Sequence, residues 1–115
     1  MAYDGERILV LRRNWLDLIM SGEKTIEVRG VRLNAGTYLL GCKSQAYGRV
    51  RFGAAFEVRN DTEWRRLYQK HLVNSRSRPY KRTWAMPIES IQQFETNVPY
   101  LHPRGAVGIV IYRSP

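Results

Sequence analysis

The sequence predicts an α+β fold in which five or six short strands form a closed or nearly closed mixed barrel flanked by two helices. Two observations support this prediction. Short apolar runs, several with period-two alternation, are separated by Gly, Pro and Asn turn signals. Two segments with helical spacing interrupt the strands, which argues against an up-and-down barrel of consecutive strands. A small α+β sandwich is the alternative. The 115 residues show no repeat, linker or change in composition, so we expect one domain spanning 1–115.

The first half of the chain alternates between strand and helix signals. We expect a buried strand over 7–11, a helix over 14–20, and strands over 25–32, 37–42 and 48–59, the last bent near Gly53. Asn14 is a plausible N-cap, and Asp17 can complete a capping box. Gly22 can take the left-handed conformation that ends a helix.

The second half begins with another amphipathic helix. Asp61 or Thr62 can cap it, and an aromatic and apolar stripe continues to about Asn74. Strand segments are then expected over 83–88 and 91–94, around Pro87. Loop signals at 97–100 and 102–105 precede a closing apolar strand over 106–112.

Charge and composition narrow the function classes. Lys and Arg outnumber Asp and Glu by 19 to 10, and a net charge of +9 on so small a domain favours an anionic partner such as nucleic acid. Cys42 is the only cysteine, so neither an intrachain disulfide nor a thiolate zinc site is expected. We therefore predict no metal and no cofactor. The polar N-terminus, the absence of long apolar runs and the lack of disulfides predict a cytoplasmic protein without a membrane span.

Three charged residues, Lys24, Glu27 and Arg29, lie where the first helix gives way to a strand. Glu27 and Arg29 are two residues apart, so they share one face of the strand. Lys24 would point the other way on a regular strand. It joins Glu27 only if it lies in a turn before the strand, which Gly22 makes possible. The competing interpretation is a solvated strand face with a surface ion pair.

Two functions fit these three side chains. In the first, Lys24 and Arg29 hold a phosphate or a base edge while Glu27 accepts a hydrogen bond from an amino group of the base. In the second, Lys24 is a desolvated nucleophile or proton shuttle and Glu27 is its partner. An ionised Glu27 opposes the lowering of the lysine pKa that the second function needs, so binding is preferred.

At this point the sequence resembles a known family. Gly22, Lys24, Glu27 and Arg29 match the G-x-K-x-x-E-x-R signature of ASCH domains, which have a PUA-like β-barrel fold. The helix over 15–22 and the closing pattern over 98–107, with its proline, tyrosine and glycine residues, are similar to those of the family. The resemblance covers about the whole chain.

The resemblance implies binding of RNA or a nucleotide in a cleft beside the barrel. Some relatives are enzymes. One branch is an amidohydrolase of acetylated cytidine that uses the motif lysine, a threonine at the position of Glu27, and a glutamate on a later helix. Here Glu27 replaces the threonine, and Glu63 is only a loose match for the later glutamate. Other relatives have been described as ribonucleases.

A basic stretch begins just before the second predicted helix and continues through the loop that follows this helix. Eight of the 19 cations fall within residues 59–82, offset there by Asp61 and Glu63. A solvated helix face with a mobile loop would explain this; a phosphate track with aromatic stacking is the functional interpretation. Beyond Lys24, Glu27 and Arg29, the predicted nucleic-acid-binding residues are Lys43, Ser44, Tyr47, Arg76, Arg78, Tyr80, Lys81, Arg82, Trp84 and Tyr100.

Three functions therefore remain open at the level of sequence. The first is an RNA- or nucleotide-binding domain with a cleft lined by Lys24, Glu27 and Arg29 and a basic outer face. The second is a small hydrolase acting on RNA or on an acylated nucleoside, with Lys24 and Glu27 as catalytic residues. The third is a domain whose basic face binds an acidic protein.

Overall fold

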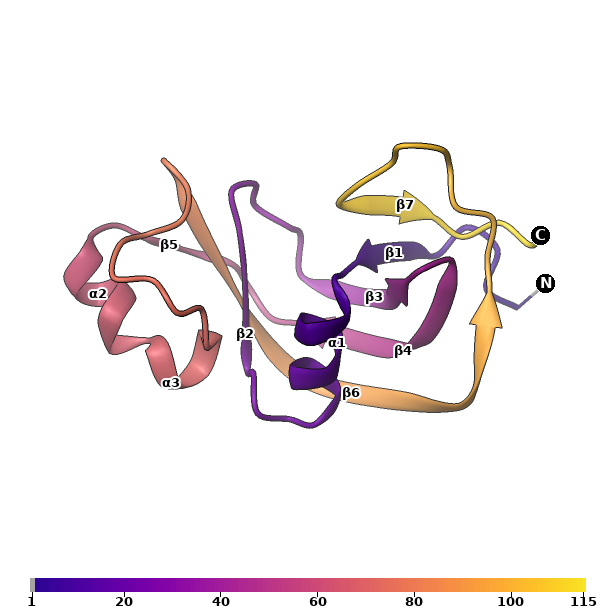
Figure 1. Cartoon of the computed structure of the whole chain (residues 1–115), viewed down its shortest axis with the longest axis horizontal. Coiled ribbons are helices and arrows are strands. Elements are labelled where there is room, and N and C mark those ends of the chain that lie inside the picture. Colours follow the sequence, from indigo (N-terminus) through magenta and orange to yellow (C-terminus); the bar gives the residue numbers. More distant parts are fainter. Residues whose placement is uncertain (1) are drawn as a thin grey trace.

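The computed structural model of the chain describes residues 2–115. In chain order its elements are β1 (Arg7–Val10), α1 (Arg13–Met20), β2 (Ile26–Arg29), β3 (Gly36–Cys42), β4 (Gln45–Phe52), β5 (Phe56–Val58), α2 (Asp61–Arg66), α3 (Tyr68–His71), β6 (Thr83–Pro99) and β7 (Ile109–Ile111). Figure 1 shows the curled sheet with α1 near its middle and α2 and α3 together at one end.

The strands form one mixed sheet in the order β2-β6-β4-β3-β1-β7, and β5 pairs with β6 beside this path. β1 and β3 are parallel, and the other pairs are antiparallel. The predicted mixed α+β barrel is thus confirmed in an open form. Among residues 2–115, β2 and β7 are the two ends of the strand order and do not pair with each other.

The long strand β6 holds the sheet together. Its C-terminal part pairs with β4, and its N-terminal part pairs with β2 on one edge and β5 on the other. Sequence analysis divided this strand between residues 88 and 91 and placed a loop over 97–100, but β6 is continuous over Thr83–Pro99, so both predictions were wrong. Pro87 is opposite Ile26 of β2, but on the other edge of β6 it lies between the residues paired with β5 and those paired with β4, so its missing N–H falls at a gap in that pairing.

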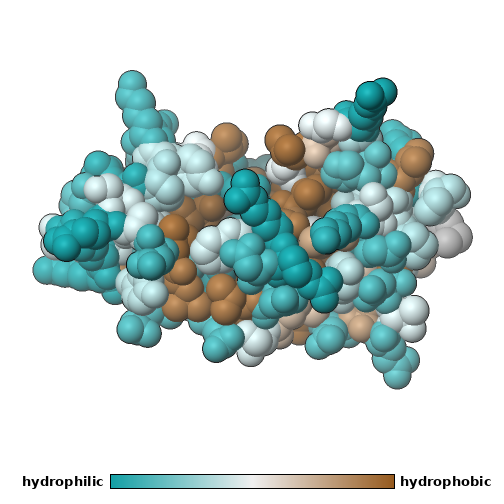
Figure 2. Space-filling view, viewed as in Figure 1, coloured by the Kyte–Doolittle hydropathy of each residue, from teal (hydrophilic) through white to brown (hydrophobic). Residues whose placement is uncertain are grey.

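Alternation of apolar side chains produces separate core clusters on the two faces of the sheet. Leu9 and Leu40 point toward α1 and pack with Leu16 and Ile19. Their strand neighbours Ile8 and Leu39 point to the other face, against Tyr100 and Tyr112. A third cluster, with Trp64 of α2 at its centre, covers β2, β5 and β6. In Figure 2, apolar side chains gather near the middle of the visible face, between hydrophilic groups.

Both helices differ from their predicted boundaries. The cap of α1 is Arg12, which makes no capping side-chain bond, and Asp17 pairs with Arg13 at 3.2 Å instead of completing a capping box. The second predicted helix is two short helices. Its cap is Asn60, whose side chain accepts a hydrogen bond from Glu63 N at 2.8 Å.

The second helix also ends earlier than Asn74, for a local reason. Leu72 adopts φ 58°, a left-handed conformation that ends α3. The imidazole Nδ1 of His71 then accepts the backbone N–H of Val73 at 2.9 Å. A side chain thus satisfies an amide that helical backbone would otherwise have bonded.

The polar segment between the predicted strands over 37–42 and 48–59 forms a tight hairpin, in which Cys42 is paired with Gln45. Lys43 and Ser44 are its two central residues, with φ values of 50° and 62°, and β4 begins directly at Gln45. Positive φ at both central positions is the pattern of a type I′ turn, whose twist matches that of the flanking strands. The closing strand β7 is shorter than the predicted 106–112.

Candidate functional site

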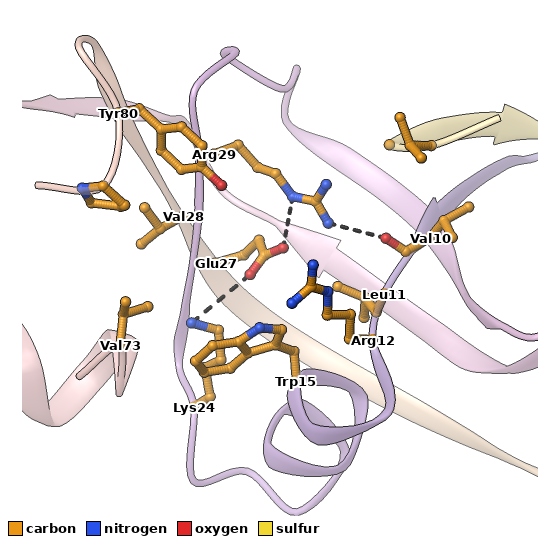
Figure 3. A pocket seen from close by; sticks show the side chains of 13 residues that line it. Val10, Leu11, Arg12, Trp15, Lys24, Glu27, Val28, Arg29, Val73 and Tyr80 are labelled. Carbon is orange, nitrogen blue, oxygen red and sulfur yellow. Dashed lines mark hydrogen bonds and ion pairs between the residues drawn. The ribbon is translucent and has the colours of Figure 1, made fainter. Parts of the chain in front are cut away.

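A cavity of about 500 Å³ occupies the open seam between β2 and the β1–β7 edge of the sheet. We call it the seam cavity. Figure 3 shows charged side chains from β2 converging at its centre, with Trp15 and Tyr80 at its sides. Its lining residues are Val10, Leu11, Arg12, Trp15, Lys24, Glu27, Val28, Arg29, Val73, Pro79, Tyr80, Val107 and Gly108.

The turn before β2 directs Lys24 into the seam cavity. Gly22 has φ +83°, in the left-handed region, and the backbone N–H of Lys24 returns to Leu18 O at 3.0 Å. Lys24 therefore lies before the regular strand, so the alternation of side chains along the strand does not fix its direction. Its Nζ lies 3.8 Å from Glu27 Oε1, on the side that Glu27 occupies.

Glu27 links the two cations of the motif. Its Oε2 accepts a hydrogen bond from Arg29 Nε at 2.9 Å, and Arg29 Nη2 donates to Val10 O at 3.3 Å across the seam. Lys24 Nζ also donates to His71 O at the end of α3. The network thus connects β2 to β1, as Figure 3 shows, and through the bond to His71 O it also connects the turn before β2 to α3.

Burial makes this network electrostatically unusual. Lys24 is 1% exposed and Glu27 is 4% exposed. Desolvation lowers the pKa of Lys24 to about 8; the negative charge of Glu27 opposes this shift, and the positive charge of Arg29 adds to it. The lysine is therefore mostly protonated at neutral pH but titrates within reach of it. A pKa lowered by desolvation and by specific charges inside a cavity is characteristic of functional sites.

The contacts of the His71 ring hold the His71 carbonyl, which accepts the hydrogen bond from Lys24 Nζ, in place. The imidazole stacks on the Trp64 indole with ring centroids 3.7 Å apart. Because Nδ1 accepts from Val73 N, the hydrogen lies on Nε2, which donates to Trp64 O at 2.9 Å. Burial lowers the pKa of His71, despite the opposing bond to Trp64, so the ring is neutral at pH 7.

Aromatic rings and an exposed cation complete the cavity. The Trp15 ring lies over Lys24, 4.9 Å from Nζ. Tyr80 is 46% exposed and packs on Gly30, where a Cβ atom would come within 2.9 Å of the ring. Arg12 is exposed at the wall. Lys24, Arg29 and Arg12 against Glu27 leave the lining with an excess of positive charge.

Several predicted binding residues lie elsewhere. Lys43 and Ser44 form the hairpin turn, and Tyr47 lies under the Arg13 guanidinium, 4.8 Å from it. Tyr100 is only 2% exposed and belongs to the second core cluster, with its hydroxyl 3.2 Å from His102 Nδ1. None of these four side chains lines the seam cavity.

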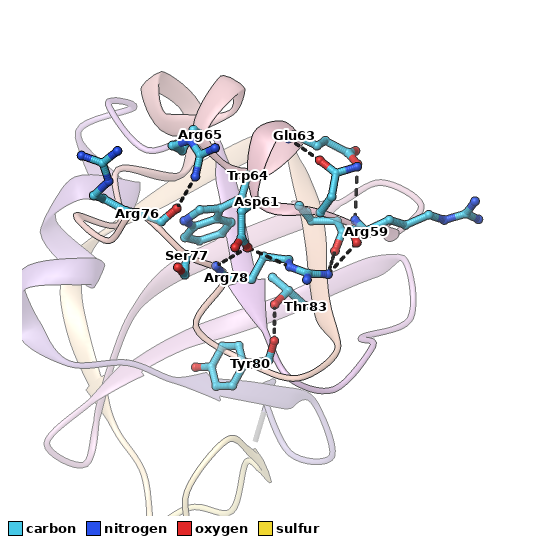
Figure 4. A network of polar contacts seen from close by, with 12 residues as sticks. Arg59, Asp61, Glu63, Trp64, Arg65, Arg76, Ser77, Arg78, Tyr80 and Thr83 are labelled. Carbon is cyan, nitrogen blue, oxygen red and sulfur yellow. Dashed lines mark hydrogen bonds and ion pairs between the residues drawn. The ribbon is translucent and has the colours of Figure 1, made fainter.

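The basic stretch is partly neutralised by internal contacts (Figure 4). Arg78 bonds Asp61 at 3.1 Å and also donates to the carbonyl of Arg59. Arg82 forms a two-point contact with Glu57, at 3.1 and 3.0 Å. By contrast, within residues 2–115 neither Arg76 nor Lys81 forms an ion pair, and both are exposed.

Trp84 lies beside a second hollow and does not line the seam cavity. This hollow, of about 540 Å³, is lined by Ala55, Phe56, Glu57, Arg59, Glu63 and Trp84. Glu63, the loose match for a later catalytic glutamate, is therefore outside the seam cavity. Glu27 is the only carboxylate among the described residues that line the seam cavity.

Sequence reasoning missed three kinds of lining residue. Trp15 belongs to the first predicted helix, and helical spacing alone does not distinguish a core face from a cavity wall. The position of Arg12 could have been used to find it, because a cation between a predicted buried strand and a predicted helix lies at an end of the sheet where ligands can reach it. Val73, Pro79 and Val107 come from loops whose approach to β2 depends on tertiary packing.

Residues 2–115 contain no cluster of three or more His, Cys, Asp or Glu side chains able to hold a metal ion. None of the helices formed by these residues has the length and apolar character needed to cross a membrane.

Comparisons with solved structures identify the fold. An ASCH protein of Zymomonas mobilis aligns with a TM-score of 0.70 at 16% identity, over 95% of this chain and 88% of that one. Two mutant forms of it align with TM-scores of 0.73 and 0.72 at 15% identity, over 96% and 95% of this chain and 90% and 91% of theirs. No protein-family model and no curated protein matches the sequence. The fold is therefore of the ASCH type, as the motif predicted.

Proposed function

We propose that this chain binds single-stranded RNA or a nucleotide, with one base held in the seam cavity. The observation that carries the proposal is the buried network of Lys24, Glu27 and Arg29 in a cavity of about 500 Å³. That volume is in the range of small-molecule sites, and a few convergent polar groups among apolar walls are typical of them. The similarity to ASCH structures and the net charge of +9 are consistent with such a ligand.

The cavity offers both donors and an acceptor to a base. The bonds within the network use only some of the N–H groups of Lys24 and Arg29, so others remain for carbonyl or ring-nitrogen acceptors. Each Glu27 oxygen retains a lone pair for an exocyclic amino group. Trp15 and Tyr80 provide aromatic surface for the base, and Arg12 is placed for the adjoining phosphate.

A titration of fluorescent single-stranded RNA at low salt tests this proposal. Glu27→Gln keeps the size of the side chain but removes its charge, so affinity should fall roughly 10- to 100-fold, as for a lost hydrogen bond to a charged group. Glu89→Gln is the matched control, because Glu89 is exposed and pairs with Arg51 at 3.2 Å. Equal affinity for the two variants would contradict a role for the seam cavity. If the chain binds no RNA but does bind an acidic protein, the third function is favoured.

A hydrolase acting on RNA or on an acylated nucleoside is the second candidate. The pKa of Lys24 near 8 favours it, since a neutral amine is available slightly above neutral pH. Turnover would then rise with pH, reach half its maximum near pH 8 and level off above that, and Lys24→Ala would abolish it. Binding without turnover would leave the first function standing. We propose the cytoplasm as the location of either activity, since a chain with one cysteine and no disulfide fits a reducing compartment.

A further inference from the structure

A row of side chains connects the seam cavity with the second hollow. Arg29 of β2 is directly opposite Trp84 of β6, and Trp84 is directly opposite Glu57 of β5. Opposed residues on neighbouring strands project from the same face of a sheet. Adjacent strands are about 5 Å apart, so the row leads from the cavity wall to the second hollow in two short steps. Arg29 is the only residue of this row that takes part in the proposed function.

Trp84 is the centre of that row, and the guanidinium groups of two arginines lie near its ring. The Arg82 guanidinium lies 5.0 Å from the ring centroid, and that of Arg32 lies 5.8 Å from it. Glu57 fixes Arg82 through its two-point contact. Arg32 is exposed and, within residues 2–115, forms no ion pair. The ring is partly buried and packs against the first core cluster, so it is a rigid surface.

The charges around the second hollow distinguish a base from a phosphate. Glu57 and Glu63 both line it, and the hydrogen bond from Arg82 lowers the pKa of Glu57 and keeps it ionised. These two carboxylates outnumber the one arginine of the lining, Arg59, so they disfavour a phosphate inside the hollow but can accept hydrogen bonds from a base. Arg32 and Arg82 lie beside the ring, where a backbone phosphate would meet positive charge.

We propose that Trp84 and the second hollow bind the nucleotide adjacent to the one in the seam cavity. The ligand is then a single-stranded polynucleotide and not a free mononucleotide. This inference rests on the proposed function, because the first nucleotide occupies the seam cavity. The Trp84 ring stacks on the second base, and Arg32 and Arg82 contact the phosphate that joins the two nucleotides.

The test compares ribonucleoside monophosphates with single-stranded RNA tetranucleotides by calorimetry on the full chain. Wild type should bind the tetranucleotide at least 10-fold more tightly than the monophosphate. Trp84→Leu should weaken tetranucleotide binding by roughly five- to 150-fold, as expected for one lost stacking contact, and leave monophosphate binding within twofold. Trp84→Phe should recover most of the lost affinity. Arg32→Gln, at an exposed position, gives a second variant whose folding is not in question.

The outcomes separate this inference from the proposed function. Equal affinity of wild type for the two ligands, or tetranucleotide binding unchanged in both Trp84→Leu and Arg32→Gln, would overturn the second site and leave the seam cavity standing. If Glu27→Gln weakens both ligands while Trp84→Leu weakens only the tetranucleotide, both proposals hold. Wild type that binds neither ligand would overturn both.

Discussion

Lys24 combines a buried position with a charge that is only partly compensated. Its ammonium is 3.8 Å from Glu27 and bonded to the carbonyl of His71, while Arg29 adds a like charge nearby. Placing a cation there costs stability unless geometry and hydrogen bonds are very good. The residue is therefore better explained by what it can bind than by what it contributes to folding.

The pH dependence of stability measures this cost. The pKa of Lys24 is about 8 in the folded chain and 10.5 in the unfolded chain, so unfolding takes up a proton between these values. Stability from this group therefore rises with pH through that window and is constant below it. Relative to Lys24→Met, wild type should gain about 3 kcal/mol between pH 7 and pH 10.5. Urea unfolding of both proteins across that range checks it; a constant difference would show that the lysine pKa is normal.

At the residue scale, sequence predicted some of the site for sound reasons. Strand alternation places Glu27 and Arg29 on one face whatever the rest of the fold does. The position of Lys24 depended on a positive φ at Gly22, which glycine permits but does not require. The burial of Tyr100 was not predictable from its proline-rich surroundings, because it follows from the packing of β6 and β7 against β1 and β3.

At the scale of elements, the β3–β4 hairpin carries two residues in a conformation that neither favours. Lys43 and Ser44 both have positive φ, and Asn-Gly suits a type I′ turn better. The double variant Lys43→Asn/Ser44→Gly should stabilise the chain by about 1 kcal/mol. RNA affinity should stay within twofold, because neither residue lines the seam cavity. A large loss of affinity would restore these two residues to the binding surface.

The loop before β6 contains cations with two different roles. Arg78 links this loop to the start of α2 through Asp61 and to the carbonyl of Arg59, so Arg78→Lys should lower the melting temperature, since lysine lacks the planar fork. Arg76→Ala/Lys81→Ala should leave the melting temperature unchanged. RNA binding should become weaker, and its affinity should depend less steeply on salt concentration, because two phosphate contacts are lost. Calorimetry and titrations at several salt concentrations separate the two roles. If Arg78→Lys and Arg76→Ala/Lys81→Ala changed the melting temperature equally, the assignment of different roles to these cations would be wrong.

Element boundaries were the least predictable part of the fold, and the reasons are local. Asn60, and not Asp61, caps α2, while Asp61 is engaged by Arg78 from a loop that sequence spacing cannot position. The break between α2 and α3 falls inside an unbroken apolar stripe. Hydrophobic periodicity shows which face of a helix is buried but not where the backbone turns. It therefore predicted a helix in this segment but not its division into α2 and α3.

At the scale of the whole molecule, the seam cavity is a consequence of an incomplete barrel. The sheet ends at β2 and β7, and across the remaining gap Arg29 bonds the Val10 carbonyl. A fully paired barrel would fill this space with backbone hydrogen bonds. The order of strand and helix signals along the sequence predicted the barrel. The gap between β2 and β7 depends on how short these two strands are, and composition does not encode that.

The affinity of Lys24→Met for single-stranded RNA tests the central claim most directly. Methionine fills the space of the lysine without its charge, and Glu27 remains paired with Arg29 at 2.9 Å, so the variant should fold. Arg51→Met is the control on the exposed surface. At low salt and pH 7, Lys24→Met should lose at least 10-fold in affinity while Arg51→Met changes less than threefold. Equal affinities in a folded Lys24→Met variant would show that nucleic acid does not enter the seam cavity.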